Sequence, residues 1–480
     1  MKTWLENRWS ALRTNFWFLP GVMALLAVAL CTGFLYLDNR LADRIFPLMQ
    51  AGSPEGVRTL LGVLIGALVT TVSIVFSTTV VVLTLAASQL GPRLLRTYVR
   101  DRSNQLLLGV FVATLFYCLT AMFVVGRLEG AGGLPDLTVL GAFLLTCASL
   151  IVLVYFIHHV AVSIQAPNVI LAVAAELRQL IERTYPAARR DPAPNDAASR
   201  EAASRQQPEL PDKHLTVPAK VSGYVQAVDE DGLLASAMKY DKVIRMMHRP
   251  GHFVLEGQPL ALLYDARLVE GSPESAGTGE VSGRDQDQSR RQGPDQDDLK
   301  QEASAAAETV SQVRSRFIMG PRRTTTQDVE FVLMELVEIA VRSLSPGIND
   351  PFTAMTCIDR IAEALRLVAG RRLPSDLQYD EQGSLRLIVS RNSFQGLCDA
   401  AFNQIRQNAG REPAVLIRLL EGLYSIAERA GTERKHAVVE LHARMVRRAA
   451  LGLPERKDRE DVEERFKKLA SAFGYSPEDE

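Results

Sequence analysis

Small and hydroxyl-bearing residues recur along one side of the apolar segment 60–102. If this segment is a helix, with about 100° between neighbours, the set projects within an arc of roughly 80° and only Val80 interrupts it. Isolated hydroxyl groups gain nothing from facing acyl chains, so the face is either a tight seam between helices or the wall of a polar path through lipid. The sequence leaves both interpretations open. The members of this hydroxyl stripe are Gly62, Gly66, Thr70, Ser73, Ser77, Thr84, Ser88 and Gly91.

A second group of polar residues flanks an amphipathic helical pattern in the second half of the chain. Ser-Pro-Gly ends that pattern, and the next pattern opens with Asp350 and Pro351, which suit the N-cap and the first helical position. The segment is therefore a structural corner, and it is compatible with a cluster that binds a ligand or a partner. The candidate polar cluster consists of Arg322, Arg323, Gln327, Asp328, Asn349 and Asp350, with Glu330 and Glu335 beside them.

Catalytic motifs with a known mechanism are absent from the sequence. It has no phosphate-binding G-x-x-x-x-G-K-[ST] loop, no G-x-S-x-G elbow, no H-E-x-x-H and no Cys-x-x-Cys pair. His158 and His159 are neighbours that point about 100° apart on a helix, so they do not converge on one ion. His248 and His252 flank a turn pattern. We therefore expect no enzymatic activity, no cofactor and no metal site.

Four uncharged apolar runs are each close to, or longer than, the ~20 residues that a helix needs to cross a bilayer. They occupy residues 16–37, 60–87, 106–125 and 137–157. Mean hydropathy is only +0.03 although 47% of the residues are hydrophobic, so the chain divides into a lipid-facing and a water-facing part. The N-terminal segment has no small-residue cleavage site after a short apolar core, which predicts an anchor and not a removed signal peptide.

Lysine and arginine in the short flanks predict the orientation of the spans. The N-terminal flank is basic, and the loop after the second span carries Arg93, Arg96, Arg100 and Arg102. Both flanks are expected in the cytoplasm, which places the N- and C-termini there as well. The basic loop suits contact with anionic lipid headgroups. The net charge of −1 gives no attraction to nucleic acid, so we expect none as a partner.

The rest of the chain divides by composition. Residues 1–160 form the predicted four-helix transmembrane domain, and 161–212 an amphipathic helix and a linker. Residues 213–266 have short β-type runs, and GHFVLEGQPLALLY resembles the half-repeat of a barrel-sandwich domain. Residues 267–315 have almost no large apolar side chains and are expected to be a disordered insertion. Residues 316–480 are predicted to be a mainly helical cytosolic domain. The fold class is thus a four-span membrane bundle followed by a cytosolic α+β region.

Four separated segments resemble one family. They are TLAASQLGPRLLRTYVRDRSNQLLLGVF from Thr84, SGYVQAVDEDGLL from Ser222, and the pair RTTTQDVEF and SPGINDPFTAMTCIDR. Together they are similar to the bacterial inner-membrane proteins called domain of unknown function 2254. The resemblance implies a multi-pass protein of the bacterial inner membrane. It implies no activity, so no catalytic residue follows from it.

Two functions are compatible with the sequence. The spans contain no Asp, Glu, Lys or Arg in their cores, which argues against a proton-driven transporter. The first hypothesis is a homo-oligomeric channel for an ion or a small solute, with the hydroxyl stripe lining the path and the cytosolic domains assembling or gating it. The alternative is a membrane-anchored regulatory or scaffold protein whose cytosolic domain binds a ligand or partner through the candidate polar cluster.

Overall fold

The computed structural model consists of two compact units, Met1–Val169 and Ile170–Glu480. We call them the N-terminal unit and the C-terminal unit, and each is described by itself. The structure describes residues 18–41, 54–90, 102–125, 135–163, 165–185, 209–269 and 296–475.

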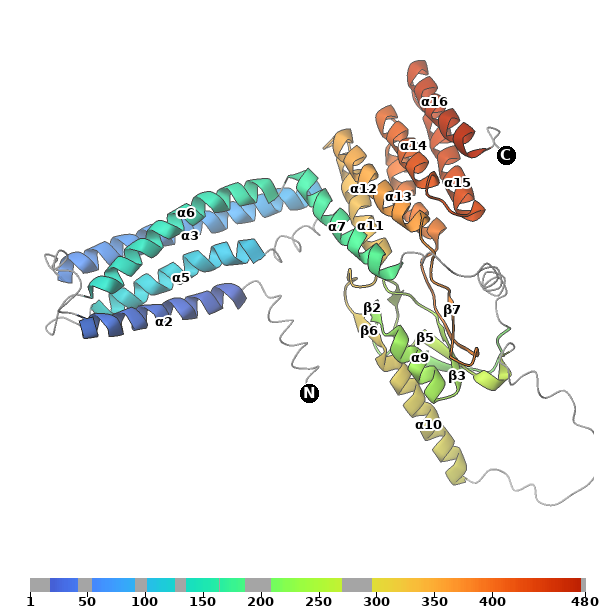
Figure 1. Cartoon of the computed structure of the whole chain (residues 1–480), viewed down its shortest axis with the longest axis horizontal. Coiled ribbons are helices and arrows are strands. Elements are labelled where there is room, and N and C mark those ends of the chain that lie inside the picture. The colour runs from blue at the N-terminus through green and yellow to red at the C-terminus, as the bar shows by residue number, and fades with distance from the viewer. Residues whose placement is uncertain are drawn as a thin grey trace, which may run out of the picture. The chain divides into compact units, whose positions relative to one another are not determined.

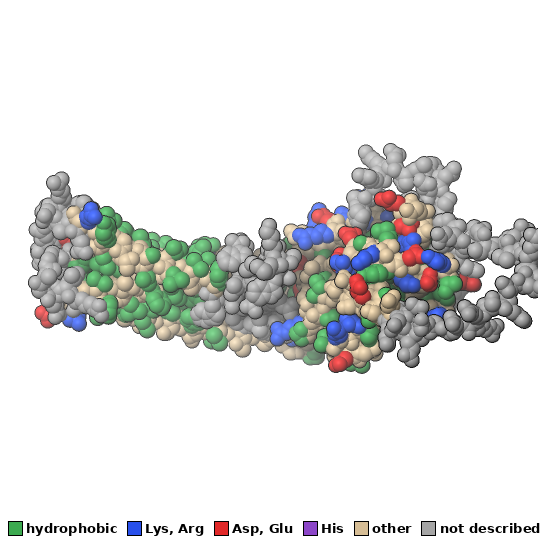
Figure 2. Space-filling model, turned by 90° about the horizontal axis from the view of Figure 1, so that it is seen from below, with side chains coloured by type: hydrophobic (Ala, Val, Ile, Leu, Met, Phe, Trp, Pro, Cys, Tyr) green, Lys and Arg blue, Asp and Glu red, His purple; other side chains and the backbone are tan. Residues whose placement is uncertain are grey.

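The N-terminal unit contains four apolar helices, which confirms that part of the predicted fold (Figure 1). Each is long and apolar enough to cross a membrane. Helices α5 and α6 each contact the other three, and α5 buries Phe111 and Tyr117 completely. Hydrophobic side chains cover much of the surface of this unit (Figure 2). The helices are α2 (Phe18–Leu41), α3 (Pro54–Leu90), α5 (Arg102–Val125) and α6 (Asp136–Ser163).

The C-terminal unit begins within α7 (Ala166–Thr184), at Ile170, and it also contains two small sheets. The apolar stripe of α7 is buried. One sheet has five strands in the order β1-β5-β3-β8-β7, and the other has three in the order β4-β2-β6. Helix α9 (Glu230–Lys239) joins β2 to β3. The strands are β1 (Leu215–Pro218), β2 (Gly223–Val228), β3 (Lys242–Met246), β4 (Phe253–Val254), β5 (Pro259–Asp265), β6 (Phe317–Gly320), β7 (Leu377–Tyr379) and β8 (Leu385–Ile388).

The expectation of a barrel-sandwich domain was wrong, because neither of the two sheets that the structure describes closes into a barrel. The reason is that the strands of residues 213–266 find partners much later in the chain. Strand β2 pairs with β6, and β3 pairs in parallel with β8, so later segments complete both sheets. A parallel pair of this kind is a long-range contact, which short-range sequence patterns do not reveal.

Helix α10 (Gln296–Ser315) occupies the C-terminal part of the segment that was expected to be disordered. This helix is rich in alanine and glutamine. Its last turns bury Thr309 and Val313, and Val313 packs in the hydrophobic core of the β region. Two buried contacts are enough to fix a helix of favourable composition. Residues 270–295 of the same segment lie outside the described residues.

The helices after β6 pack into a layered helical region (Figure 1). Their apolar faces carry most of the fully buried leucine, isoleucine and valine side chains of the unit. Their bounds follow the apolar periodicity of the sequence closely. They are α11 (Val329–Ser343), α12 (Pro351–Ala369), α13 (Phe394–Asn408), α14 (Pro413–Ala427), α15 (Glu433–Ala450) and α16 (Arg456–Phe473).

Candidate functional site

The hydroxyl stripe lies on an outer side of the four-helix unit. Gly62 is half-buried, and the members from Gly66 to Ser88 are exposed. A Cβ atom built on Gly62 or Gly66 would meet no described atom within 4 Å. The stripe is therefore free of the other three spans of its own chain. Gly91 lies outside the described residues, as do Arg93, Arg96 and Arg100; Arg102 is the first residue of α5.

Most of the stripe hydroxyls already have a partner within their own helix. Thr70 donates to the carbonyl oxygen of Gly66 at 2.9 Å, Ser73 to that of Val69 at 2.8 Å, and Thr84 to that of Val80 at 2.8 Å. Such back-bonding satisfies the donor of each hydroxyl and leaves its oxygen free to accept. A row of acceptor oxygens on an apolar helix is what a polar path through lipid needs.

Other polar groups of the N-terminal unit are used between helices. Thr114 on α5 hydrogen-bonds Ser149 on α6 at 2.9 Å, and both are buried. The hydroxyl of Tyr117 donates to the carbonyl oxygen of Thr138 at 3.1 Å. These contacts hold α6 against α5, because hydrogen bonds between helices add to packing where the solvent is apolar.

Asp38 near the end of α2 caps the first turn of α6. Its carboxylate accepts from the backbone N–H of Leu137 at 2.9 Å, and from the N–H and hydroxyl of Thr138 at 3.0 and 2.7 Å. The N–H groups at the start of a helix lack partners within it, so a carboxylate there stabilises the helix. Sequence reasoning missed this contact, since nothing in the local pattern links residues that are 100 apart.

Replacing Asp38 with alanine is expected to destabilise the four-helix unit by about 1–3 kcal/mol, because two backbone donors lose their acceptor. Replacement with asparagine retains one acceptor oxygen and is expected to cause a smaller loss. Unfolding of the full-length protein by increasing sodium dodecyl sulfate in mixed micelles measures the difference. Native stability of the alanine variant would show that the carboxylate of Asp38 contributes no cap to α6.

Part of the candidate polar cluster forms one compact site at the start of α11. The Nε and Nη2 atoms of Arg323 lie 2.9 and 2.7 Å from Oδ2 of Asp328, whose side chain is 1% exposed. Oδ1 of Asp328 accepts from the N–H of Phe331 and caps the helix. Burial raises the pKa of the Asp328 carboxyl, and the charge of Arg323 opposes that shift.

The residues beside this pair hold α11 against the three-stranded sheet. The side-chain amide of Gln327 bonds both the N–H and the carbonyl oxygen of Val228, at 2.9 and 3.1 Å. The backbone oxygen of Arg322 accepts from Gln226 at 2.8 Å, while the Arg322 side chain is exposed. Arg323 and Asp328 thus bond each other, and Gln327 bonds strand β2. Together these contacts fix the sheet to the helical region.

A second ion pair, which sequence reasoning missed, adjoins the first. Arg249 in the turn after β3 bonds Glu330. Tyr185, at the end of α7, is 3% exposed. Its hydroxyl interacts electrostatically with Arg249, Glu330 and Asp328. Burial raises the pKa of Tyr185 to about 12. The end of α7, the turn after β3 and the start of α11 therefore meet at one ionic cluster.

Asn349 and Asp350 lie at the other end of α11, one helix length from Asp328. Asp350 is the N-cap of α12, where its carboxylate accepts from the N–H of Thr353 at 3.1 Å and from its hydroxyl at 2.6 Å. Asn349 adopts a positive φ of 48° in the corner. The structure therefore places these two residues in the expected helical corner, and it does not bring them together with Arg322–Asp328.

His248 and His252 flank the Arg249 turn with ring centroids 5.8 Å apart. Burial lowers the pKa of both imidazoles, and the neighbouring Arg249 adds to the shift at His252. A lowered pKa means that the folded protein binds fewer protons than the unfolded chain below about pH 6.5. The histidines therefore favour folding above that pH, and this contribution is lost as the pH falls.

We expect the melting temperature of the C-terminal unit to decrease when the pH is lowered from about 7.5 to about 5.5. In a His248→Gln/His252→Gln variant the decrease is expected to be smaller. Thermal unfolding followed by circular dichroism at the two pH values tests this. A variant with the full pH dependence of the native protein would show that these imidazoles do not titrate with folding. His442 on α15 is also buried, and its burial lowers the pKa of its imidazole. This residue should account for part of the pH dependence that remains in the variant.

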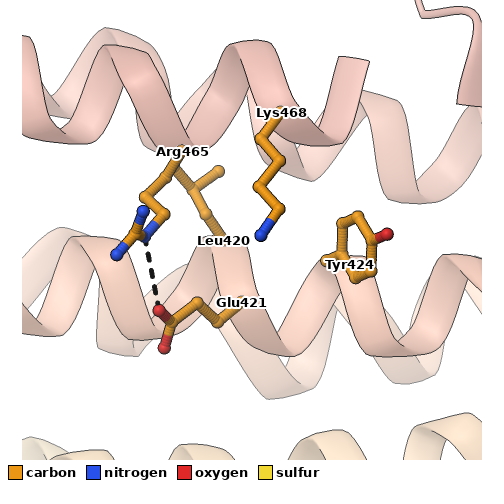
Figure 3. Close-up of a pocket in the computed structure, with 5 residues that line it drawn as sticks. All are labelled: Leu420, Glu421, Tyr424, Arg465 and Lys468. Atoms are coloured by element: carbon orange, nitrogen blue, oxygen red, sulfur yellow. Dashed lines mark ion pairs between the residues drawn. The ribbon is translucent and has the colours of Figure 1, made fainter. Parts of the chain in front are cut away.

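A small open pocket lies between α14 and α16 (Figure 3). Its volume is about 200 Å³. Arg465 and Lys468 reach from α16 toward Glu421 and Tyr424 on α14, and Leu420 forms part of the wall. Arg465 lies 3.4 Å from Glu421, which also pairs with Arg418 at 3.2 Å. This carboxylate offsets only one of the two cationic side chains, Arg465 and Lys468, so the pocket lining keeps a positive formal charge. Within the described residues, no group of three His, Cys, Asp or Glu side chains could hold a metal ion.

Comparison with known proteins decides the family. The family model described as "Predicted membrane protein (DUF2254)" matches residues 13–425. The chain belongs to the DUF2254 family. Uncharacterized protein Mb1321c of Mycobacterium bovis and uncharacterized protein Rv1290c of Mycobacterium tuberculosis are each 29% identical to it over 437 residues, which cover 90% of this chain and 76% of each relative. No solved structure matches the chain.

Membership of the DUF2254 family agrees with the four candidate spans and makes this a predicted membrane protein. The hydroxyl stripe, the ionic cluster at the start of α11 and the α11–α12 corner all lie inside the matched residues. Arg465 and Lys468 of the pocket lie beyond them. The matched residues therefore include the four apolar helices and the part of the C-terminal unit that precedes the end of α14.

Proposed function

We propose that the protein is a homo-oligomeric membrane conduit in which the hydroxyl stripe of α3 lines the path. The observation that supports this is the exposure of the stripe on the single chain. Membrane helices approach one another closely where small residues such as glycine and serine recur about every four residues on one face. Several copies around an axis bring their α3 helices together, and the free acceptor oxygens then replace part of the hydration of an ion or a small solute.

The C-terminal unit serves assembly or gating in this proposal. Its helical layers are tightly packed, and the ionic cluster at the start of α11 holds α7, the sheet and α11 together. The alternative, a scaffold that binds a ligand through the candidate polar cluster, has less support. The side chains of Arg323, Gln327 and Asp328 already bond within the protein, so they are not free to recognise a partner.

Site-directed cross-linking in native membranes tests the oligomer. Ser73→Cys places a thiol on the stripe, and Ile151→Cys places one on α6 at a side chain that is 73% exposed. A short bismaleimide is expected to link two chains at position 73 and to leave position 151 as monomers. Native mass spectrometry of the uncross-linked protein then gives the number of copies. Monomers at position 73, or equal cross-linking at both positions, would contradict the proposal.

A further inference from the structure

The corner between α11 and α12 exposes two large apolar side chains. Phe352 is 75% exposed and Ile348 is 40% exposed. The corner is rigid, because Asp350 caps α12, Pro351 begins it and Asn349 holds a positive φ. Rigid exposure of an aromatic ring is unfavourable in water and is typical of a surface that contacts another phase or molecule.

The contacts between α7 and α12 show at which end of the C-terminal unit this corner lies. Nη1 of Arg178 lies 3.6 Å from Oε1 of Glu363, and Arg371 donates to the carbonyl oxygens of Ile181 and Tyr185. Residue numbers increase in the same direction along both helices, so the two helices run parallel (Figure 1). Arg178 and Glu363 each come twelve residues after the first residue of their helix. Ile170 on α7, the first residue of the C-terminal unit, is therefore level with the second turn of α12, close to the corner.

The first turn of α7 is where the chain arrives from the membrane. Helix α6, the last candidate span, ends at Ser163, and α7 begins at Ala166. The three Cα–Cα steps from Ser163 to Ala166 cannot extend more than about 11 Å, so the start of α7 lies close to the lipid headgroups whenever α6 crosses a bilayer. The corner, being close to the level of Ile170, lies at the same end of the unit. Leu171 on α7 is also 46% exposed near this end.

The charge of the corner suits lipid. Residues 345–349 carry no ionisable side chain, and the only carboxylate, that of Asp350, is bonded to Thr353. An aromatic and a branched aliphatic side chain with no free acid beside them are the residues that enter the interfacial region of a bilayer. We propose that the α11–α12 corner inserts Ile348 and Phe352 into the bilayer interface and docks the C-terminal unit on the membrane that its own chain spans.

Fluorescence quenching by lipid tests this on the full-length protein in vesicles. A bimane label is attached at Phe352→Cys in a Cys147→Ala background, since the other four cysteines are buried. Phe253→Cys is the matched control, because Phe253 is an aromatic residue that is 52% exposed. It follows Gly251 by two residues, and Gly251 adjoins Asp328 at the opposite end of α11 from the corner. Ile348→Cys is a second position in the corner, in case one label perturbs folding.

Phospholipids with a nitroxide near the headgroup are expected to remove most of the emission at positions 352 and 348 and little of it at 253. Equal quenching at 352 and 253 would overturn the proposal. So would a label at 352 that is shielded from iodide in the buffer and also escapes quenching by lipid, because it would then face protein. The result does not depend on conduction, so it stands or falls separately from the proposed conduit.

Discussion

Replacing Ser77 with leucine is expected to abolish the passage of solute while leaving the protein folded and oligomeric. Ser77 is exposed on its own chain, so the larger side chain displaces no neighbour within the four-helix unit. In a path lined by several α3 helices, each copy adds an apolar branch at the same level and removes one acceptor oxygen. A barrier raised by about 1.4 kcal/mol slows passage tenfold, and a ring of leucines is expected to exceed that.

The measurement is the release of ions from vesicles that hold equal amounts of native or variant protein. Thr78→Leu is the control, because Thr78 is also an exposed hydroxyl residue but points about 100° away from Ser77. We expect flux to survive in Thr78→Leu and to be lost in Ser77→Leu. Equal flux in the two variants would remove α3 from the path. Loss of the oligomer in Ser77→Leu would instead place this residue in a seam between copies.

Replacing Gly251 with alanine is expected to destabilise the C-terminal unit by roughly 3 kcal/mol or more. Gly251 has a φ of +95°, and a Cβ atom there would lie 2.0 Å from Oδ2 of Asp328 and 2.8 Å from Nη2 of Arg323. The side chain must therefore push apart a buried ion pair that also caps α11. Strain from the positive φ adds to this loss.

Gly257→Ala separates the two causes. Gly257 has a similar φ of +83°, but a Cβ atom there would meet no described atom within 4 Å. It should lose only about 1–2 kcal/mol from backbone strain. Chemical denaturation of both full-length variants in detergent, followed by circular dichroism, measures the difference. Equal destabilisation would show that the Arg323–Asp328 pair yields easily and is not a rigid junction.

Local patterns predicted the helices well. The expected spans 16–37, 60–87, 106–125 and 137–157 became α2, α3, α5 and α6, which are up to six residues longer at an end. Each of these helices has an apolar composition that does not depend on its neighbours in the fold. The N-cap at Asp350 was equally predictable, because capping depends on a few adjacent residues.

The sheets and the site contacts could not be predicted in the same way. The pairing of β3 with β8 and the contact between Asp38 and Thr138 join residues far apart in the chain. Tyr185 gave no signal in the sequence, although it lies in the ionic cluster with Arg249 and Glu330. Arg323 and Asp328 were selected for their charge, but only the structure shows that they bond each other. The sequence therefore indicated which side chains are polar or charged, but it did not indicate which residues they contact.

Single-channel recording of the purified native protein in planar bilayers tests the proposed conduit. We expect discrete current steps that disappear in Ser77→Leu and persist in Thr78→Leu, at the same oligomeric size for all three proteins. Silence of the intact native oligomer across a range of voltage, membrane tension and salt would contradict it.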